Sequence, residues 1–332
     1  MLDRGGGFKS LFGHIWKTEN LFKAWELFKR GKTSRDDVKK FSRNLEEHIY
    51  LLQNDLRTGV YRHGPYERFV VHDPKQRTIH KAQVRDRVVH QAIVNVIEPI
   101  FEKRFIHDSY SCRVSKGTHA AVTRFRSFLR SASVNNTRTV YILKCDVKKF
   151  FAAVDHQILL DLLRRHIDDG PTNLLLEYIV HTFSSSEGKG IPLGNLTSQL
   201  FANVYLHELD WYVKQTLRIQ HYVRYCDDFV IITQSRDEAW MLAQKIEEFL
   251  HGHLTLDLHP NKVSVRTWKQ GVDFLGYVLL PHATILRPKT AYRAIGRVSE
   301  GNMSSYLGLC SHADAYELSC LLKNISKRTV GP

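Results

Sequence analysis

One stretch, from His221 to Thr233, restricts the fold more than any other part of the chain. Aromatic and β-branched residues flank a short link that contains Asp227 and Asp228, and this pattern predicts two strands joined by a tight turn. Adjacent side chains of a strand point to opposite faces, so two neighbouring aspartates share a face only where a turn interrupts the strand. Two carboxylates held together repel each other unless a cation lies between them. The stretch therefore predicts half of a hard-metal site; a solvated surface turn is the alternative.

The overall charge indicates a polyanionic partner. The chain has 332 residues, with 48 Lys and Arg against 34 Asp and Glu and a net charge of +14. A folded protein with such an excess most often binds nucleic acid, although charge kept for solubility is the alternative. The five cysteines follow neither disulfide nor zinc spacing, and no segment approaches the roughly 18 consecutive apolar residues of a membrane span. We expect a cytoplasmic protein that has no membrane partner.

A third carboxylate is predicted from an earlier strand. The apolar run Thr139–Leu143 leads into Asp146, so an acidic residue again stands at the end of a buried strand. Three aspartates from two neighbouring strands can hold two Mg²⁺ ions roughly 4 Å apart, which activate an attacking 3′-hydroxyl and neutralise a leaving pyrophosphate. Asp146, Asp227 and Asp228 are therefore the candidate catalytic and metal-binding residues, with Mn²⁺ as a substitute ion.

Two basic segments before Asp146 are candidate phosphate-binding regions. Phe69–His72 and the run that follows predict a β-hairpin whose loop presents Lys75 and Arg77. These cations could grip a triphosphate; an ordinary charged turn is the alternative. Further along the chain, a polar loop with Arg113 and Lys116 leads into a helix, and such a loop is suited to backbone phosphates of a nucleic acid.

The remaining sequence predicts mostly helices. Ser34 and Asp37 have the spacing of a capping box, followed by one helix with an apolar, core-facing stripe from Phe41 to Leu56. The turn Pro192-Leu193-Gly194 opens a later helix. The other predicted elements are helices at Thr18–Arg30, Asp86–Phe101, Leu200–Leu217 and Asp237–Leu250, a strand pair at Val272–Leu280, and a small, basic helical tail at Arg287–Val330.

Taken together, these features resemble the reverse transcriptases over nearly the whole chain. Tyr225-Cys226-Asp227-Asp228 matches their Tyr-x-Asp-Asp motif, and Leu143–Phe151 matches the segment that holds their first catalytic aspartate. The resemblance implies an α+β fold of the right-hand polymerase type, with an antiparallel palm sheet packed on helices and a short helical thumb. It also implies RNA-directed DNA polymerisation from dNTPs, on a template RNA and through an RNA–cDNA duplex, with two Mg²⁺ ions.

The resemblance implies further roles for individual residues. Phe151 becomes the steric gate that crowds a ribose 2′-hydroxyl, Val147 offers a backbone carbonyl to the metal, and Lys262 lies near the leaving phosphate as a general acid. The implied nucleotide-binding residues are Lys75, Arg77, Phe151, Leu193, Gly194, Gln199 and Lys262, and the implied template or primer contacts are Arg113, Lys116, Tyr225, and Leu275 and Gly276 of a primer-grip hairpin.

One departure from the family pattern indicates a subgroup. Most reverse transcriptases have Pro-Gln-Gly where this chain has Pro192-Leu193-Gly194, followed by Ser198-Gln199. This pattern and the stretch Ser304–Tyr316 resemble the reverse transcriptases of diversity-generating retroelements, which occur in bacteria, archaea and phages. The enzymes of that group copy a template-repeat RNA with errors at adenines, and the resulting cDNA replaces part of a target gene. A small basic accessory protein oligomer assists them in engaging the RNA. Loss of the Gln contact is expected to loosen base selection; a neutral apolar substitution in a faithful polymerase is the alternative.

The resemblance also divides the chain into regions and leaves two other functions open. The expected regions are an N-terminal helical extension (1–60), fingers (61–138), a palm (139–270, with a fingers insertion around 156–190), a primer-grip hairpin (271–286) and a short thumb (287–332). One alternative is a retron- or group II intron-like bacterial reverse transcriptase, including defence-associated ones, although retron enzymes normally keep a Gln-Gly turn. The other is a non-catalytic RNA-binding module on a polymerase fold, against which the three intact aspartates argue.

Overall fold

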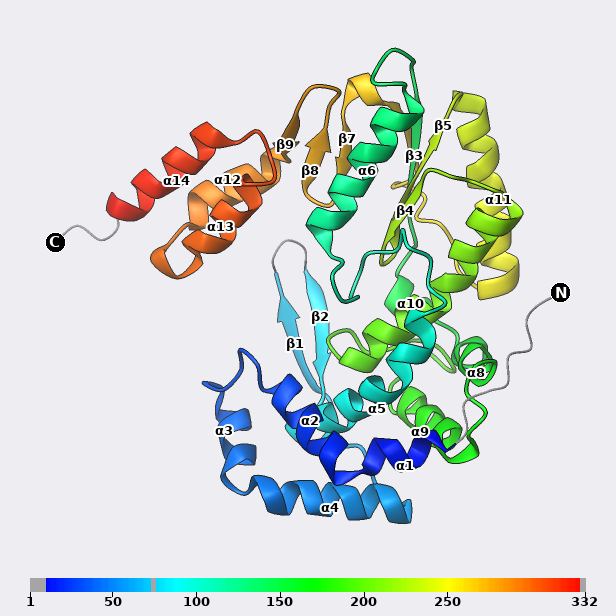
Figure 1. Ribbon diagram of the computed structural model, residues 1–332, viewed down its shortest axis with the longest axis vertical. Coiled ribbons are helices and arrows are strands. Elements are labelled where there is room, and N and C mark those ends of the chain that lie inside the picture. Colours follow the sequence, from blue (N-terminus) through cyan, green and yellow to red (C-terminus); the bar gives the residue numbers. More distant parts are fainter. Residues whose placement is uncertain (1–9, 73–75, 329–332) are drawn as a thin grey trace. The chain divides into compact units, whose positions relative to one another are not determined.

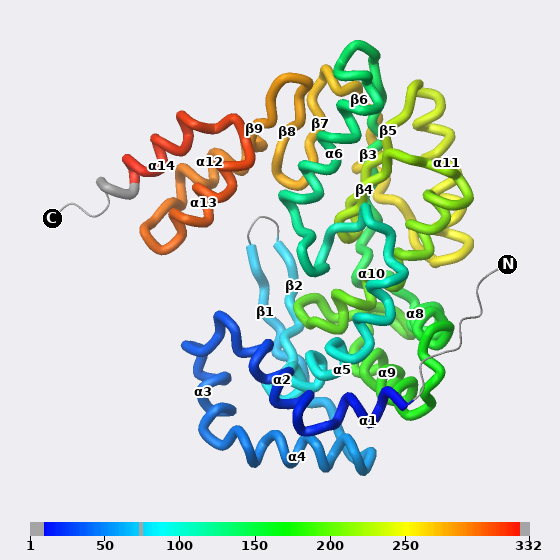
Figure 2. The backbone as a smooth tube through the Cα atoms, in the orientation of Figure 1, coloured from blue at the N-terminus to red at the C-terminus, as the bar shows by residue number. Residues whose placement is uncertain are grey.

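The computed structural model describes residues 10–72 and 76–328, which fold into two compact units (Figures 1 and 2). The hairpin unit consists of the described residues within Met1–Ile106, Val147–Asp210 and Phe249–Asp257. The aspartate unit consists of those within His107–Asp146, Trp211–Glu248 and Leu258–Pro332. The described residues form many helices and three antiparallel sheets. The expected α+β class with antiparallel sheets is therefore confirmed, whereas the five expected regions stay a prediction.

A long apolar helix, α5 (Val84–Glu102), is the centre of the hairpin unit. Its buried side chains include Val88, Ile93 and Ile97, and the N-terminal helices pack against it (Figure 1, blue). Burial of these apolar faces, rather than intrinsic helix propensity, supplies most of the stability of such short helices. The N-terminal helices are α1 (Leu11–Trp16), α2 (Thr18–Phe28), α3 (Asp36–Arg43) and α4 (Leu45–Thr58).

The capping box expected at Ser34 and Asp37 is wrong. Helix α3 follows Arg35, which makes no side-chain capping bond. The Asp37 carboxylate accepts a hydrogen bond from the Val38 N–H at 2.9 Å and forms ion pairs with Lys81 at 2.8 Å and Arg87 at 3.1 Å. None of these partners is the Ser34 backbone that a capping box requires. The single helix expected to carry the stripe from Phe41 to Leu56 is also divided, since the backbone leaves the helical region at Asn44.

The expected basic hairpin is present in the hairpin unit. Strands β1 (Glu67–Val71) and β2 (Arg77–Lys81) pair in antiparallel register, with Val71 opposite Arg77. Arg77 is exposed at the start of β2, whereas Lys75 lies outside the described residues. The other helices of this unit are α7 (Phe150–Ala153), α8 (His156–Arg164), α9 (Gly170–His181) and α10 (Leu196–Trp211).

A four-stranded antiparallel sheet, in the order β4-β5-β3-β6, organises the aspartate unit; Figure 1 labels its strands β3, β4 and β5. Its central strands are apolar on both faces, and Ile142, Val230 and Ile232 on one face pack with Phe125 of helix α6. The predicted strand, turn and strand at His221–Thr233 are therefore confirmed. The elements are α6 (Thr118–Ala132), β3 (Tyr141–Asp146), a π-helical turn (Tyr212–Thr216), β4 (Tyr222–Tyr225), β5 (Asp228–Thr233), α11 (Arg236–Leu254, which ends in the hairpin unit) and β6 (Ser264–Thr267).

A smaller sheet and a helical segment complete the aspartate unit. The predicted strand pair at Val272–Leu280 is present, and the structure adds a third strand that the sequence analysis did not predict. The elements are β7 (Val272–Phe274), β8 (Tyr277–Leu279), β9 (Thr284–Leu286), α12 (Pro288–Arg297), α13 (Met303–Cys310) and α14 (Tyr316–Arg328). Across residues 10–72 and 76–328, every helix is too short or too polar to cross a membrane.

Candidate active site

The register of the central sheet brings two of the predicted aspartates together. Asp146 is the last residue of β3 and Asp228 the first of β5, and they lie directly opposite each other in the antiparallel ladder. Opposite residues of such a ladder have Cβ atoms roughly 4.5–5.5 Å apart and project from the same face. Two residues that are distant in the sequence therefore place their carboxylates side by side, at the end of strands whose other residues are mostly buried.

The third aspartate is positioned by the turn between β4 and β5. Tyr225 pairs with Asp228, so only Cys226 and Asp227 remain in the loop. Cys226 has a φ of 55°, a left-handed conformation that usually requires glycine and is strained for a residue with a Cβ. This kink takes Asp227 out of the strand alternation. Two adjacent aspartates therefore need not project to opposite faces of the sheet.

A buried arginine donates a hydrogen bond to the backbone of the turn between β4 and β5. Arg224 in β4 is completely buried, and its guanidinium donates a hydrogen bond of 3.1 Å to the carbonyl oxygen of Cys226. Its backbone also pairs with residues 108–110 through Arg224 N–H to Asp108 O at 3.0 Å and Tyr110 N–H to Arg224 O at 2.9 Å. Sequence reasoning missed Arg224. A cation within an otherwise apolar strand was the available signal, because buried arginines are rare unless they are bonded.

The environment of the aspartates disfavours their negative charges. Burial and the charge of Asp146 raise the pKa of Asp227 above its usual range. Burial also raises the pKa of Asp228 to about 6; Asp146 and Asp227 add to the rise, and Lys144 opposes it. Anions in such surroundings favour a bound cation, which would offset both the burial and the mutual repulsion.

Asp228→Asn is expected to stabilise the metal-free protein above about pH 6. Because the pKa of Asp228 is raised from 3.8 to about 6 in the folded state, the folded state binds this proton more tightly and stability falls as the pH rises from about 4 to 6. Asparagine does not ionise, so the variant does not lose this stability as the pH rises. In EDTA at about pH 7.5 the variant should gain roughly 1–3 kcal/mol, and the gain should disappear near pH 4. Chemical unfolding at both pH values measures the difference; equal stabilities at pH 7.5 would contradict the prediction.

Lys262 directly contacts the carboxylate cluster. Its ammonium lies 2.5 Å from Asp146 Oδ1, so the structure brings this predicted residue to the first aspartate. Its assigned role as a general acid stays a prediction. Lys144 was not singled out from the sequence. It lies on the same face of β3 as Asp146, two residues earlier, and its ammonium donates a 2.8 Å hydrogen bond to the Asp273 carbonyl oxygen in β7.

The carboxylate oxygens of Asp146, Asp227 and Asp228 are ligands of the type that Mg²⁺ binds. Carboxylate oxygens are the ligands that Mg²⁺ prefers, and Asp146 and Asp228 project from one face. As arranged here, no three His, Cys, Asp or Glu side chains of residues 10–72 and 76–328 already form a metal-binding group, and Lys262 supplies the positive charge at Asp146. Binding two ions would therefore require the aspartate side chains to reorient and Lys262 to release Asp146.

The hairpin unit brings several of the predicted nucleotide-binding residues together. The N–H of Ile191, next to the Pro192–Gly194 turn, donates a 2.8 Å hydrogen bond to the carbonyl oxygen of Phe151, and the Leu193 carbonyl oxygen accepts one of 3.0 Å from the N–H of His80 in β2. The turn therefore lies between the predicted steric gate and the basic hairpin. Val147 is buried, Phe151 and Leu193 are half-buried, and Gly194 and Gln199 are exposed; their roles toward nucleotide and metal stay predictions.

The predicted template and primer contacts are bonded within the aspartate unit. The Arg113 guanidinium donates to the Ser109 carbonyl oxygen at 2.8 Å, and the Lys116 ammonium donates to that of His107 at 2.9 Å. Thr118 lies within hydrogen-bonding distance of the Tyr225 hydroxyl. Positive φ values of 51° at Leu275 and 93° at Gly276 form the two-residue turn between β7 and β8. Contact of these residues with nucleic acid stays a prediction.

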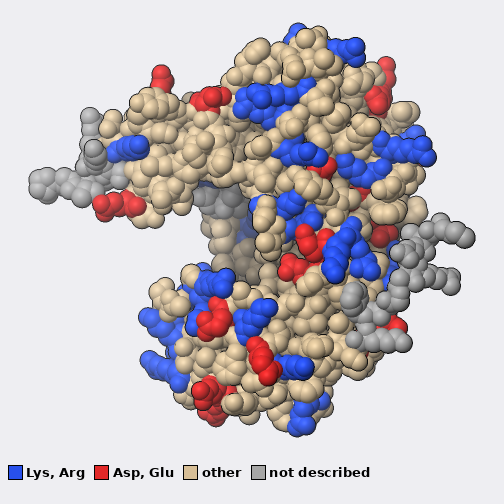
Figure 3. Space-filling model, in the orientation of Figure 1, with Lys and Arg blue, Asp and Glu red and all other residues tan. Residues whose placement is uncertain are grey.

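Comparison with protein families identifies the class of enzyme. A family model described as reverse transcriptase (RNA-dependent DNA polymerase) matches residues 72–279, more than half of the chain. The chain belongs to the reverse transcriptase family. Its enzymatic class is therefore RNA-directed DNA polymerase, which implies template RNA and dNTPs as substrates, and reverse transcriptases generally use Mg²⁺. Figure 3 shows Lys and Arg side chains on the drawn face of both units, in keeping with polyanionic substrates.

Two relatives illustrate how far this reverse transcriptase has diverged. It is 25% identical to Protein YkfC of Escherichia coli (strain K12) over 272 residues, which cover 70% of this chain and 71% of that protein. It is 22% identical to the group II intron-encoded protein LtrA of Lactococcus lactis subsp. cremoris over 303 residues, which cover 70% of this chain and 49% of LtrA. The chain thus spans about half the length of LtrA.

Proposed function

We propose that Asp146, Asp227 and Asp228 hold two Mg²⁺ ions and carry out nucleotidyl transfer in this reverse transcriptase. The observation that supports the assignment best is the register that places Asp146 opposite Asp228 on one face of the sheet. Magnesium bound there would polarise the attacking 3′-hydroxyl and the leaving pyrophosphate. The aspartates bind the ions, Val147 adds its backbone carbonyl, and Lys262 protonates the leaving phosphate. The chain would act as a right-hand polymerase with the five regions expected from its sequence.

We further propose that the protein is the mutagenic reverse transcriptase of a diversity-generating retroelement. Leu193 supports this proposal, because an apolar side chain stands where most family members have glutamine and it is only half-buried. A leucine side chain can neither donate nor accept a hydrogen bond, so base selection at the turn would lose one polar contact. The template would be a template-repeat RNA copied with errors at adenines, and a small basic accessory protein oligomer would be the partner.

Leu193→Gln is expected to make the enzyme more accurate. Restoring a polar side chain to the turn should reduce substitutions opposite template adenine by about tenfold, the equivalent of one hydrogen bond of roughly 1.4 kcal/mol in selection. Sequencing of cDNA made on one RNA template by both proteins measures the change. Leu174→Gln makes the same substitution at an exposed position of α9 and should leave the error rate unchanged. Equal error spectra for all three proteins would leave Leu193 with a packing role only.

A group II intron-like reverse transcriptase is the second candidate. The similarity to LtrA, a group II intron-encoded protein, favours it. The same sequencing experiment separates the two functions, because an intron-like enzyme should already copy template adenines as accurately as the other bases. Addition of the accessory protein gives a second criterion: stimulated synthesis on the template-repeat RNA supports the retroelement assignment.

A further inference from the structure

A buried asparagine joins the predicted nucleotide-selecting turn to the basic hairpin. Asn195 follows Gly194 directly and is 1% exposed. Its Nδ2 donates a 2.8 Å hydrogen bond to the carbonyl oxygen of His80, and its Oδ1 accepts one of 3.2 Å from the N–H of Ala82. Together with the 3.0 Å bond from His80 N–H to the Leu193 carbonyl oxygen, three hydrogen bonds connect residues 193–195 with the end of β2.

These bonds make the turn an additional edge of the two-stranded sheet. In an antiparallel pair, both backbone groups of every second residue point away from the partner strand. The N–H and carbonyl of His80 both bond to the turn, so His80 is such an outward-facing residue of β2, and Ala82, two residues on, follows the same pattern. The Asn195 side-chain amide therefore takes the place of a peptide group in the ladder. An isolated two-stranded hairpin is only marginally stable in water, which makes this third partner important for the position of β2.

Close packing against β2 also explains the glycine in this turn. Gly194 has a φ of 114°, and a Cβ added there would lie 2.7 Å from the Ile79 side chain. Ile79 and Arg77 are two residues apart in β2 and so project from the same face. The turn thus packs against the face of β2 that carries Arg77.

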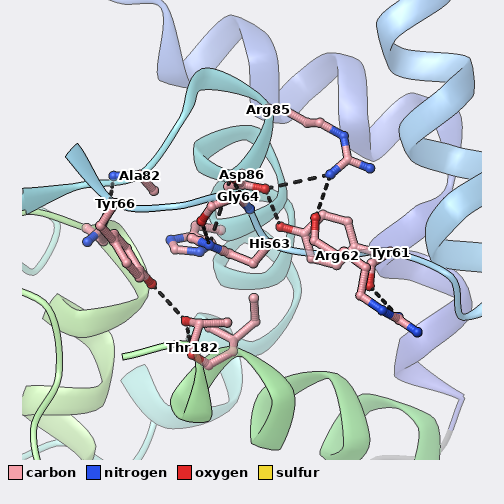
Figure 4. Close-up of polar contacts among 12 residues, drawn as sticks. Tyr61, Arg62, His63, Gly64, Tyr66, Ala82, Arg85, Asp86 and Thr182 are labelled. Carbon is pink, nitrogen blue, oxygen red and sulfur yellow. Dashed lines mark hydrogen bonds and ion pairs between the residues drawn. The ribbon is translucent and has the colours of Figure 1, made fainter. Parts of the chain in front are cut away.

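The base of the hairpin is held independently of Asn195. Asp86, in the first turn of α5, is 1% exposed and accepts hydrogen bonds from the Tyr61 hydroxyl at 2.7 Å and the Gly64 N–H at 3.0 Å. Tyr66, next to the start of β1, bonds to Thr182 at 2.9 Å. Figure 4 shows this network around the segments that enter β1 and leave β2. Loss of the Asn195 bonds should therefore loosen the alignment of β2 with the turn without unfolding the hairpin unit.

We propose that Asn195 is a positioning residue for nucleotide selection, which holds the strand that carries Arg77 in register with the Leu193–Gly194 turn. This inference rests on the proposed roles of Arg77 in gripping the triphosphate and of Leu193 in base selection. The Asn195 side chain acts here through its hydrogen bonds to the backbone groups of His80 and Ala82. Its removal should weaken binding of the incoming nucleotide and alter the error spectrum, while the rate at saturating nucleotide changes little.

Steady-state primer extension on an RNA template tests this proposal. Asn195→Ala should raise KM for the correct dNTP about tenfold, as expected for loss of buried hydrogen bonds, with kcat changed less than about threefold. Asn173→Ala is the matched control: Asn173 is a half-buried asparagine of the same unit whose Nδ2 donates a 2.9 Å bond to the Ile167 carbonyl oxygen. It should leave KM and the error spectrum unchanged, although both variants lose stability. Both are assayed well below their melting temperatures.

Additional variants keep the outcome decisive. Asn195→Asp preserves the oxygen that accepts from Ala82 but sets a second acceptor against the His80 carbonyl oxygen and buries a charge, so it should raise KM at least as much as the alanine variant. Arg77→Ala should raise KM by itself, and the double variant Arg77→Ala plus Asn195→Ala should show less than the product of the single effects, because both act through β2.

An unchanged KM in Arg77→Ala would overturn the proposed role of Arg77. A raised KM in Arg77→Ala, with Asn195→Ala and Asn195→Asp matching the native protein, would overturn the positioning role alone.

Discussion

Replacing Asp227 and Asp228 together with alanine should abolish DNA synthesis on an RNA template while the protein stays folded. These two carboxylates lie next to Asp146 at the end of a mostly buried sheet, and burial raises the pKa of each. Burying two negative charges lowers the stability of the folded protein, so removal of these carboxylates should not destabilise it. Metal ions held there would supply several kcal/mol of transition-state stabilisation. We therefore expect a loss of at least about a thousandfold in primer extension.

The control for this experiment is an acidic residue of the same unit. Asp237 is exposed in the first turn of α11, and Asp237→Ala should retain native activity. Circular dichroism shows whether each variant is folded, and Asp146→Asn should reproduce the loss. Activity that survives the double substitution in a folded protein would refute the assignment of the metal site and favour a non-catalytic RNA-binding role.

Arg224→Ala should lower the free energy of unfolding by about 3 kcal/mol or more. Arg224 is completely buried and donates to the Cys226 carbonyl oxygen at 3.1 Å. Alanine would leave a cavity and remove the hydrogen-bond donor to the Cys226 carbonyl oxygen. The turn is already strained, because Cys226 has a φ of 55°. Urea unfolding measures the change. Because the same bond supports the turn that carries Asp227, primer extension should also fall in the fraction that remains folded.

The matched variant for Arg224 is an arginine of the same sheet. Arg266 lies in β6 opposite Ile142 and is exposed, so Arg266→Ala should change the free energy of unfolding by less than about 0.5 kcal/mol. If the two alanine variants are equally stable, Arg224 has no special role in supporting the turn.

The strand pattern around Asp227 and Asp228 was readable because it is local. Alternating apolar residues and a short polar link predicted β4, β5 and the turn, and the same argument found β3 with Asp146 at its end. The helices α5 and α10 and the basic hairpin followed from equally local patterns. The expected capping box at Asp37 is absent, and its carboxylate pairs with Lys81 and Arg87; no spacing rule contains that information.

By itself, the sequence determined the enzyme family and singled out the three candidate aspartates and the departure at Leu193, because each of these is a matter of residue type and spacing. Only the tertiary structure decided which residues support them. The register of β3 and β5 placed Asp146 opposite Asp228, burial raised the pKa values of Asp227 and Asp228, and hydrogen bonds between distant segments gave Arg224 and Asn195 their partners. Register, burial and long-range hydrogen bonds depend on which groups lie next to each other after the chain has folded. A buried polar side chain needs a hydrogen-bond partner, and that partner can come from any segment that the fold brings close.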